Sequence, residues 1–156
     1  AILFDDGVRT VIPPRLGWRH GLRVVREVLA SVPAGRGTAV VEALRSAGRL
    51  LRRRGVVIVV VDRVCPLPRR ELVALAGRHE VVVVRVTDPL LRKASNDTRL
   101  PVIDPEAGRR GVLRRAPRPR AEPTPPGIDV LELTTDIDYL VEVRAMLEAR
   151  ERRRVH

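Results

Sequence analysis

The residue with the clearest chemical potential is Asp62, the carboxylate that ends an unbroken aliphatic run from Val56 to Val61. Every residue of this run is β-branched, which suits a strand and disfavours a helix. An apolar run without alternation predicts a strand buried on both faces, in the middle of a parallel sheet. Ligands of such sheets bind at the carboxyl ends of the strands, so Asp62 is a candidate binding residue. The alternative is that Asp62 caps the following turn.

Two families of phosphate chemistry fit the sequence poorly. A P-loop ATPase also has a hydrophobic strand that ends in an acid, but no Gly-x-x-x-x-Gly-Lys-Ser/Thr occurs in the chain. Asp5, Asp6, Asp62 and Thr87 together supply part of the set used by a phosphoacceptor receiver domain. That domain also needs a positioned lysine, and Lys93 lies in a polar loop. A phosphoryl-transfer enzyme is therefore the weakest of the functional hypotheses.

The remaining reactive side chains are isolated in the sequence. His20, His79 and His156 lack metal-ligand spacing, so we predict that each is a solvated surface residue. Cys65 is the only cysteine, which excludes a disulfide framework and indicates a reducing, intracellular compartment. We expect Cys65 to be a small buried hydrophobe and Trp18 to be a partly buried anchor.

Composition indicates one folded domain over residues 1–156. Hydrophobic residues make up 44% of the chain and aromatic residues only 2%, so the core must consist of aliphatic side chains. The net charge of +11 favours a polyanionic partner. However, Lys93 is the only lysine among 30 basic residues, a skew typical of a GC-rich coding bias. Nucleic-acid binding is thus the alternative function, expected to be non-specific because aromatic residues for base stacking are lacking.

Periodicity predicts an alternation of strands and helices. Besides the run at 56–62, apolar patterns predict strands at 1–4, 8–12, 81–86 and 128–133, and a hairpin formed by 100–103 and 111–113. Residues 114–127 contain five prolines and no periodicity, which predicts a Pro/Arg-rich loop or linker. Strands that alternate with helices through short connections predict an α/β, Rossmann-like sandwich with a mostly parallel sheet flanked by helices.

Helical spacing predicts four helices. The first, at 19–31, should bury Leu22, Val25, Val28 and Leu29. Thr38 is a candidate N-cap for the second, which should end at Arg52–Arg54 before Gly55 and bury Val40, Val41, Leu44, Ala47 and Leu51. The third, at 69–78, should bury Leu72, Leu75 and Ala76, and the last, at 136–154, Leu140, Val143 and Leu147.

Several segments in order resemble the bacterial family called domain of unknown function 58, which has the von Willebrand factor A fold. The matching segments are Pro13-Pro14-Arg15-Leu16-Gly17, Gly35-Arg36-Gly37-Thr38, the strand that ends at Asp62, Val84-Arg85-Val86-Thr87-Asp88-Pro89, and 129–139. The family's first strand carries Asp-x-Ser-x-Ser, which is absent here, and Asp5-Asp6-Gly7-Val8-Arg9 matches the strand that follows it. The resemblance therefore predicts an N-terminally incomplete domain that lacks the first strand and helix.

The resemblance also implies a site and partners. In the metal-ion-dependent adhesion site of this fold, Thr38 corresponds to the threonine ligand and Asp62 to the aspartate ligand. Both supply hard oxygen atoms suited to Mg²⁺, but the site is incomplete without Asp-x-Ser-x-Ser, so we expect no cofactor in this chain by itself. The family implies a protein-interaction module rather than an enzyme, with a MoxR-type AAA+ ATPase as partner. It further implies a cytoplasmic domain tethered to the membrane through upstream segments, since this chain has no apolar run long enough to span one.

Overall fold

The computed structural model describes residues 1–35, 37–63, 65–89, 100–103, 110–113, 125–136 and 138–154. Lys93, His156 and most of the predicted linker, 114–124, lie outside the described residues. The helices and strands follow in the order β1 (Ile2–Phe4), β2 (Val8–Val11), α1 (Trp18–Ala30), α2 (Val40–Leu50), β3 (Val56–Asp62), α3 (Arg69–Ala76), β4 (Glu80–Thr87), β5 (Leu100–Ile103), β6 (Arg110–Leu113), β7 (Ile128–Thr134) and α5 (Tyr139–Arg154).

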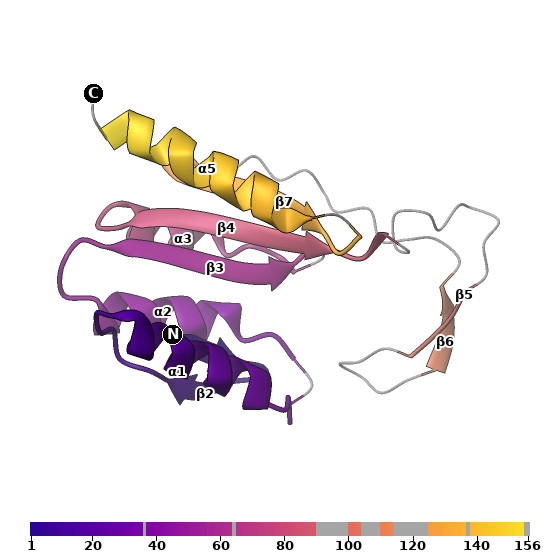
Figure 1. Ribbon diagram of the computed structural model, residues 1–156. Helices are drawn as coiled ribbons and strands as arrows, with labels where there is room; N and C mark the ends of the chain where they lie inside the picture. The colour runs from indigo at the N-terminus through magenta and orange to yellow at the C-terminus, as the bar shows by residue number, and fades with distance from the viewer. Residues whose placement is uncertain are drawn as a thin grey trace.

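The centre of the molecule is a three-stranded parallel sheet with the order β3-β4-β7 (Figure 1). Val57 of β3 pairs with Val81 of β4, which pairs with Ile128 of β7. β3 and β4 consist mostly of β-branched residues, as expected for strands in a parallel sheet. The predicted α/β class, with a parallel sheet flanked by helices, is confirmed.

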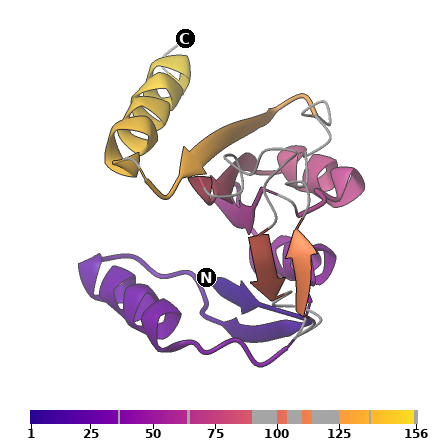
Figure 2. The same cartoon turned by 90° about the vertical axis from the view of Figure 1, so that its right-hand side faces the viewer.

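Helices cover both faces of this sheet and create two separate cores (Figure 2). The larger core packs α2 and α3 against one face, where Leu44 and Leu72 meet Val59, Val83 and their neighbours. The smaller core lies on the opposite face, where partly buried side chains of α5 contact Val82, Val84 and Leu133. Leu72 is fully buried, so its truncation to alanine would remove about 2–5 kcal/mol of stability.

Two antiparallel hairpins complete the chain. β1 and β2 pair from Ile2 with Val11, with an irregularity after Leu3, and α2 packs against β1. β5 and β6 pair from Leu100 with Leu113, so the predicted hairpin is confirmed. In the part of the chain that the structure describes, β1 and β2 form a sheet of their own and do not pair with β3.

The prediction that the strand at Val56–Asp62 is buried on both faces is wrong. β3 lies at the edge of the described sheet, and its side chains alternate between exposed and buried. Val57, Val59 and Val61 enter the larger core. Val56, Ile58 and Val60 point to the other face and are exposed. This happens because α5 covers that face only over β4 and β7.

The predicted inward faces of two helices are also wrong in part. None of the residues of α1 is buried, and the four that its spacing assigns to the core are all exposed: Leu22, Val25, Val28 and Leu29. In α5, Val143 packs against the smaller core as predicted, but the helix contributes Met146 beside it, while Leu140 and Leu147 are exposed. By contrast, Leu44, Leu72 and Leu75 are buried as predicted.

Candidate functional site at the cleft between β1 and β3

A large cavity lies between the β1–β2 hairpin and the edge strand β3. Its volume is about 1010 Å³, and it is lined by Ala1–Asp5 and by every residue of β3. Side chains of α2 and the residue after it line the cavity as well, namely Ala43, Leu44, Ala47, Leu50 and Leu51. Most of this lining is aliphatic, so the cleft offers an apolar surface beside the edge of the described sheet.

Both site residues predicted from the sequence, Thr38 and Asp62, line this cleft. Asp62 ends β3, and its Oδ1 atom accepts a hydrogen bond of 2.7 Å from the backbone N–H of Cys65. The turn-capping alternative for Asp62 is therefore observed. Cys65 is buried in the larger core, as predicted. The prediction that Thr38 caps α2 is wrong, because the N-cap residue is Ala39, which makes no side-chain capping hydrogen bond.

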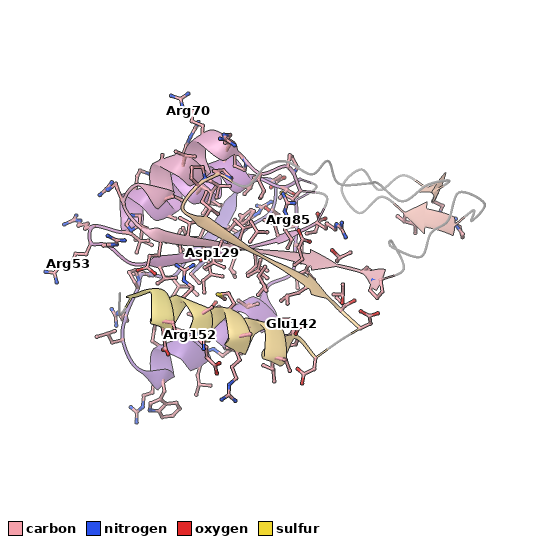
Figure 3. The ribbon with its side chains drawn as sticks, turned by 90° about the horizontal axis from the view of Figure 1, so that it is seen from above. Arg53, Arg70, Arg85, Asp129, Glu142 and Arg152 are labelled. Atoms are coloured by element: carbon pink, nitrogen blue, oxygen red, sulfur yellow. The ribbon has the colours of Figure 1, made fainter. Side chains whose placement is uncertain are left out.

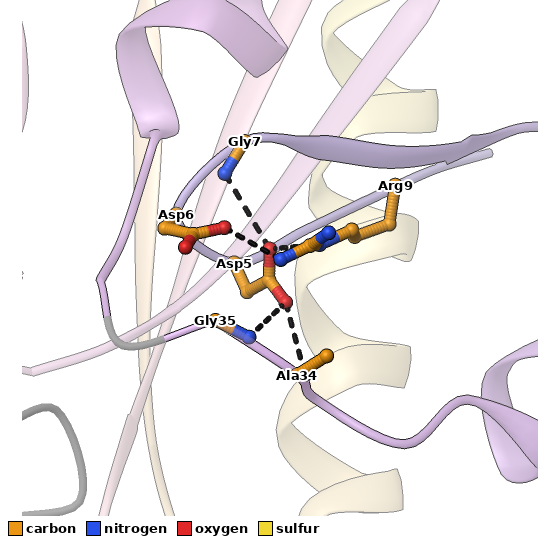
Figure 4. A network of polar contacts seen from close by, with 6 residues as sticks. All are labelled: Asp5, Asp6, Gly7, Arg9, Ala34 and Gly35. Carbon is orange, nitrogen blue, oxygen red and sulfur yellow. Dashed lines mark hydrogen bonds and ion pairs between the residues drawn. The ribbon is translucent and has the colours of Figure 1, made fainter.

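A second acidic residue, Asp5, lines the same cleft and organises the loop that carries Thr38 (Figure 4). Its Oδ2 atom accepts hydrogen bonds from the backbone N–H groups of Ala34 and Gly35, at 3.2 and 2.9 Å. Its Oδ1 atom accepts a 2.6 Å hydrogen bond from Nε of Arg9. The Arg9 side chain, followed by these backbone donors, lowers the pKa of Asp5 below its ordinary value, although burial opposes the shift.

Backbone contacts hold the same loop against β1. The backbone N–H of Ala39 donates a 2.6 Å hydrogen bond to the carbonyl of Asp5. A Cβ atom at Gly35 would collide with the carboxylate of Asp6, so this close approach favours glycine. Sequence reasoning misses the role of Asp5, because Asp5-Asp6-Gly7 has the composition of a simple turn. The usable signal is an aspartate directly after an apolar strand, the same signal that singles out Asp62.

The side-chain oxygens of Thr38 and Asp62 are of the type that binds Mg²⁺, but two such ligands are too few to hold the ion. A threonine hydroxyl and a carboxylate are hard oxygen ligands, but Mg²⁺ requires near-octahedral coordination and gives up its waters reluctantly. The Asp5 oxygens already accept hydrogen bonds from Arg9 and two backbone amides. Among the described residues, no group of three or more His, Cys, Asp or Glu side chains could hold a metal ion.

The other candidate residues lie elsewhere or differ from the predictions. His79 is 3% exposed, so the prediction of a solvated histidine is wrong there, because His79 lies between the end of α3 and β4. Trp18 is 71% exposed rather than a partly buried anchor, and its ring lies beside the guanidinium of Arg19. Thr87 of the receiver-like set is buried. No helix in the described ranges is both long and apolar enough to cross a membrane.

These observations define an α/β protein with acidic and hydroxyl side chains gathered at a cleft beside the edge strand of a parallel sheet. Its family follows from a family model described as "Protein of unknown function DUF58", which matches residues 1–122. The match covers more than half of the chain, so the protein belongs to this family, as the motifs in the sequence indicated.

Relatives of the chain occur in mycobacteria. The chain is 28% identical over 176 residues to "Uncharacterized protein Rv1480" of Mycobacterium tuberculosis, covering 97% of this chain and 54% of that protein. It is 29% identical over 171 residues to "Uncharacterized protein MAV169" of Mycobacterium avium, covering 92% of this chain and 95% of that protein. The chain thus spans about half the length of the first of these relatives. No solved structure matches the chain.

Proposed function

We propose that this chain is a non-enzymatic protein-interaction module with a von Willebrand factor A-like sheet, and that its binding edge carries Thr38 and Asp62. The observation that carries this proposal is the cleft. There an apolar sheet edge, unpaired within the described residues, ends in exposed hydroxyl and carboxylate groups. An exposed, flat and hydrophobic edge strand is a template for another polypeptide strand. Following the family resemblance, the protein partner that binds at this edge is a MoxR-type AAA+ ATPase.

A further part of the proposal is that one more strand fills the cleft. A strand between β1 and β3 would pair with both edges and cover apolar side chains on both faces. It would thereby join the β1–β2 sheet to the parallel sheet. Relatives about twice as long as this chain have residues enough to supply it. According to the resemblance, this strand would bring the Asp-x-Ser-x-Ser residues beside Thr38 and Asp62 and complete a set of oxygen ligands for Mg²⁺.

Mg²⁺ calorimetry on two forms of the protein tests the site. The chain of residues 1–156 should bind no tighter than roughly millimolar, because two protein ligands are too few. A longer form that includes an Asp-x-Ser-x-Ser strand should bind more tightly, and Asp62→Ala should abolish the gain. Asp62→Asn is the matched control for folding, because its amide oxygen can still accept the hydrogen bond from Cys65. An unchanged Mg²⁺ affinity in the longer Asp62→Ala form would remove Asp62 from the site.

Binding to the ATPase is measured separately. We expect the longer form to bind a MoxR-type ATPase from the same organism in a Mg²⁺-dependent manner, and Asp62→Ala to weaken that complex. If the longer form binds Mg²⁺ tightly but forms no complex with the ATPase, the proposed metal site stands and the proposed partner is wrong.

The rival function, a nucleic-acid-binding domain, has one structural observation in its favour. A groove of about 590 Å³ between α2 and α3 is lined by the arginines Arg45, Arg49, Arg70 and Arg78. Among the described residues, Glu71 is the only acid in its lining, and it pairs with Arg45 at 2.8 Å, a contact that lowers the pKa of Glu71. The groove therefore carries an excess of positive charge, which attracts phosphates without reading bases.

A further inference from the structure

Helix α1 presents an apolar stripe that no described element covers. Trp18, Leu22, Val25 and Leu29 are between 54% and 81% exposed. Their spacing of four, three and four residues places them on one face of the helix. Figure 2 shows α1 at the periphery of the molecule, outside the β1–β2 hairpin. So large an apolar face on one helix marks a surface that contacts something other than water.

This stripe is distinct from the cleft. The only residue of α1 that lines the cleft is Val28, which is followed there by Ser31, Val32 and Pro33. The half-buried residues Val24 and Glu27 also lie on the side of α1 away from the stripe. A strand placed in the cleft would therefore leave Trp18, Leu22 and Leu29 exposed.

Positive charge borders the stripe along one side. Arg19, Arg23 and Arg26 each follow a residue of the stripe directly, so they form a parallel row on the helix. The Arg19 guanidinium lies 5.8 Å from the centroid of the Trp18 ring. Glu27 is the only acidic residue of α1 and lies on the far side, 3.9 Å from Arg26.

We propose that α1 is an interfacial helix that lies on the surface of an anionic lipid bilayer. Trp, Leu and Val on one face with arginines beside them are the residues of helices that lie in the plane of the membrane interface. The apolar stripe would enter the boundary between headgroups and acyl chains, and the arginines would reach back to the lipid phosphates. The helix has 13 residues, about 20 Å in length, so it lies on the bilayer and does not span it.

Charge argues for lipid over a second copy of the chain. Each copy carries a net charge of +11, and the arginine row lies beside the stripe, so two stripes would face each other across like charges. An anionic bilayer supplies the opposite charge together with an apolar layer.

Trp18 is the only tryptophan, so its fluorescence reports directly on α1. The experiment titrates the protein with vesicles of phosphatidylcholine alone and with vesicles that also contain phosphatidylglycerol, at physiological salt. With phosphatidylglycerol present, we expect the Trp18 emission to move to shorter wavelength and the protein to sediment with the vesicles. Neither effect should occur with phosphatidylcholine alone.

Matched variants distinguish the effect of the α1 stripe from the effect of any exposed apolar or charged residue elsewhere on the surface. Leu22→Glu should weaken vesicle binding about tenfold or more, since burial of one leucine is lost. Val141→Glu should not weaken it, although Val141 on α5 is 66% exposed and Leu22 is 57% exposed. Arg23→Gln should weaken binding about fivefold, whereas Arg53→Gln, which removes the same charge outside α1, should have little effect (Figure 3). Both positions in each pair are exposed, so circular dichroism should remain unchanged.

Three results would overturn the proposal. The first is Trp18 emission that does not respond to phosphatidylglycerol vesicles. The second is an equal loss of binding in the Leu22→Glu and Val141→Glu variants. The third is a blue shift that depends on protein concentration and requires no vesicles, which would show that a second copy covers the stripe.

Discussion

At the scale of single residues, Asp5 ties the β1–β2 hairpin to the loop that carries Thr38. Its carboxylate joins Arg9 on β2 to the loop that leads to Thr38, a sequence separation of about thirty residues. Asp5 is 8% exposed and accepts several hydrogen bonds, so its charged form is favoured in the folded state. We therefore regard Asp5 as the residue that positions Thr38, and not as a metal ligand.

This role predicts a pH-dependent effect of Asp5→Asn. Because the pKa of Asp5 is lowered in the folded protein, the unfolded chain binds more protons in acid, and stability rises with pH. The contribution of Asp5 should be complete above the ordinary aspartate pKa of about 3.9 and should be lost as the pH falls below it. Urea unfolding should thus show that Asp5→Asn lowers the free energy of unfolding strongly at neutral pH and less in acid.

Asp6→Asn, which removes an exposed carboxylate paired with the same arginine, serves as the control. A loss of unfolding free energy in Asp5→Asn that is the same at every pH would contradict this prediction.

At the scale of elements, α5 is attached by an ion-pair group as well as by a short apolar contact. Within the described part of the chain, only Val143 and Met146 of this helix pack against the smaller core. Near its end, Arg150 pairs with Asp129 at the start of β7 and, at 3.0 Å, with Glu80 at the start of β4. Its side chain is 13% exposed, so this ion-pair group is largely shielded from water. Arg150 thereby fixes the helix across two adjacent strands.

Removal of this guanidinium should loosen α5. Arg150→Met keeps the aliphatic part of the side chain but removes the guanidinium from two carboxylates, and should cost about 1–3 kcal/mol in the free energy of unfolding. Arg144→Met is the matched control, because Arg144 is 83% exposed and pairs with Glu148 within the same helix. That change should cost roughly 0.5 kcal/mol or less. Chemical denaturation measures both, and equal effects would show that Arg150 acts only as a surface charge.

At the scale of the whole molecule, the net charge is +11, and almost all of the positive charges belong to arginine side chains. Some of these arginines form structural ion pairs, as Arg9 and Arg150 do. Others line the groove between α2 and α3 or border the stripe on α1. A distribution over several surfaces favours general attraction to polyanions over recognition of one nucleic-acid sequence.

Nucleic-acid binding should therefore be electrostatic only. We expect titrations with several DNA duplexes to give the same affinity at equal salt, and that affinity to fall steeply as salt rises, because counterion release drives such binding. Fluorescence anisotropy with labelled duplexes measures both quantities. A preference of about a hundredfold or more for one sequence, beyond the range of backbone contacts, would favour the nucleic-acid-binding function over the interaction module.

Local patterns in the sequence were sufficient to predict most of the elements and the class of the fold. The strands predicted at 56–62, 81–86 and 128–133 form the parallel sheet, and Leu44, Leu72 and Leu75 lie in the core as their spacing predicts. These features are local, because branching at Cβ and helical periodicity act within a few residues. The motifs around Thr38 and Asp62 likewise indicated the family through the order of their residues alone.

Tertiary contacts were needed to show which apolar surfaces are covered and which carboxylate holds the site together. A run such as Val56–Val61 has the same composition in the centre of a sheet and at its edge, because burial depends on neighbours distant in the sequence. For the same reason, the amphipathic pattern of α1 could not show that Leu22 and Leu29 lie uncovered. The partners of Asp5 are backbone amides of Ala34 and Gly35, and backbone donors leave no signature in side-chain types.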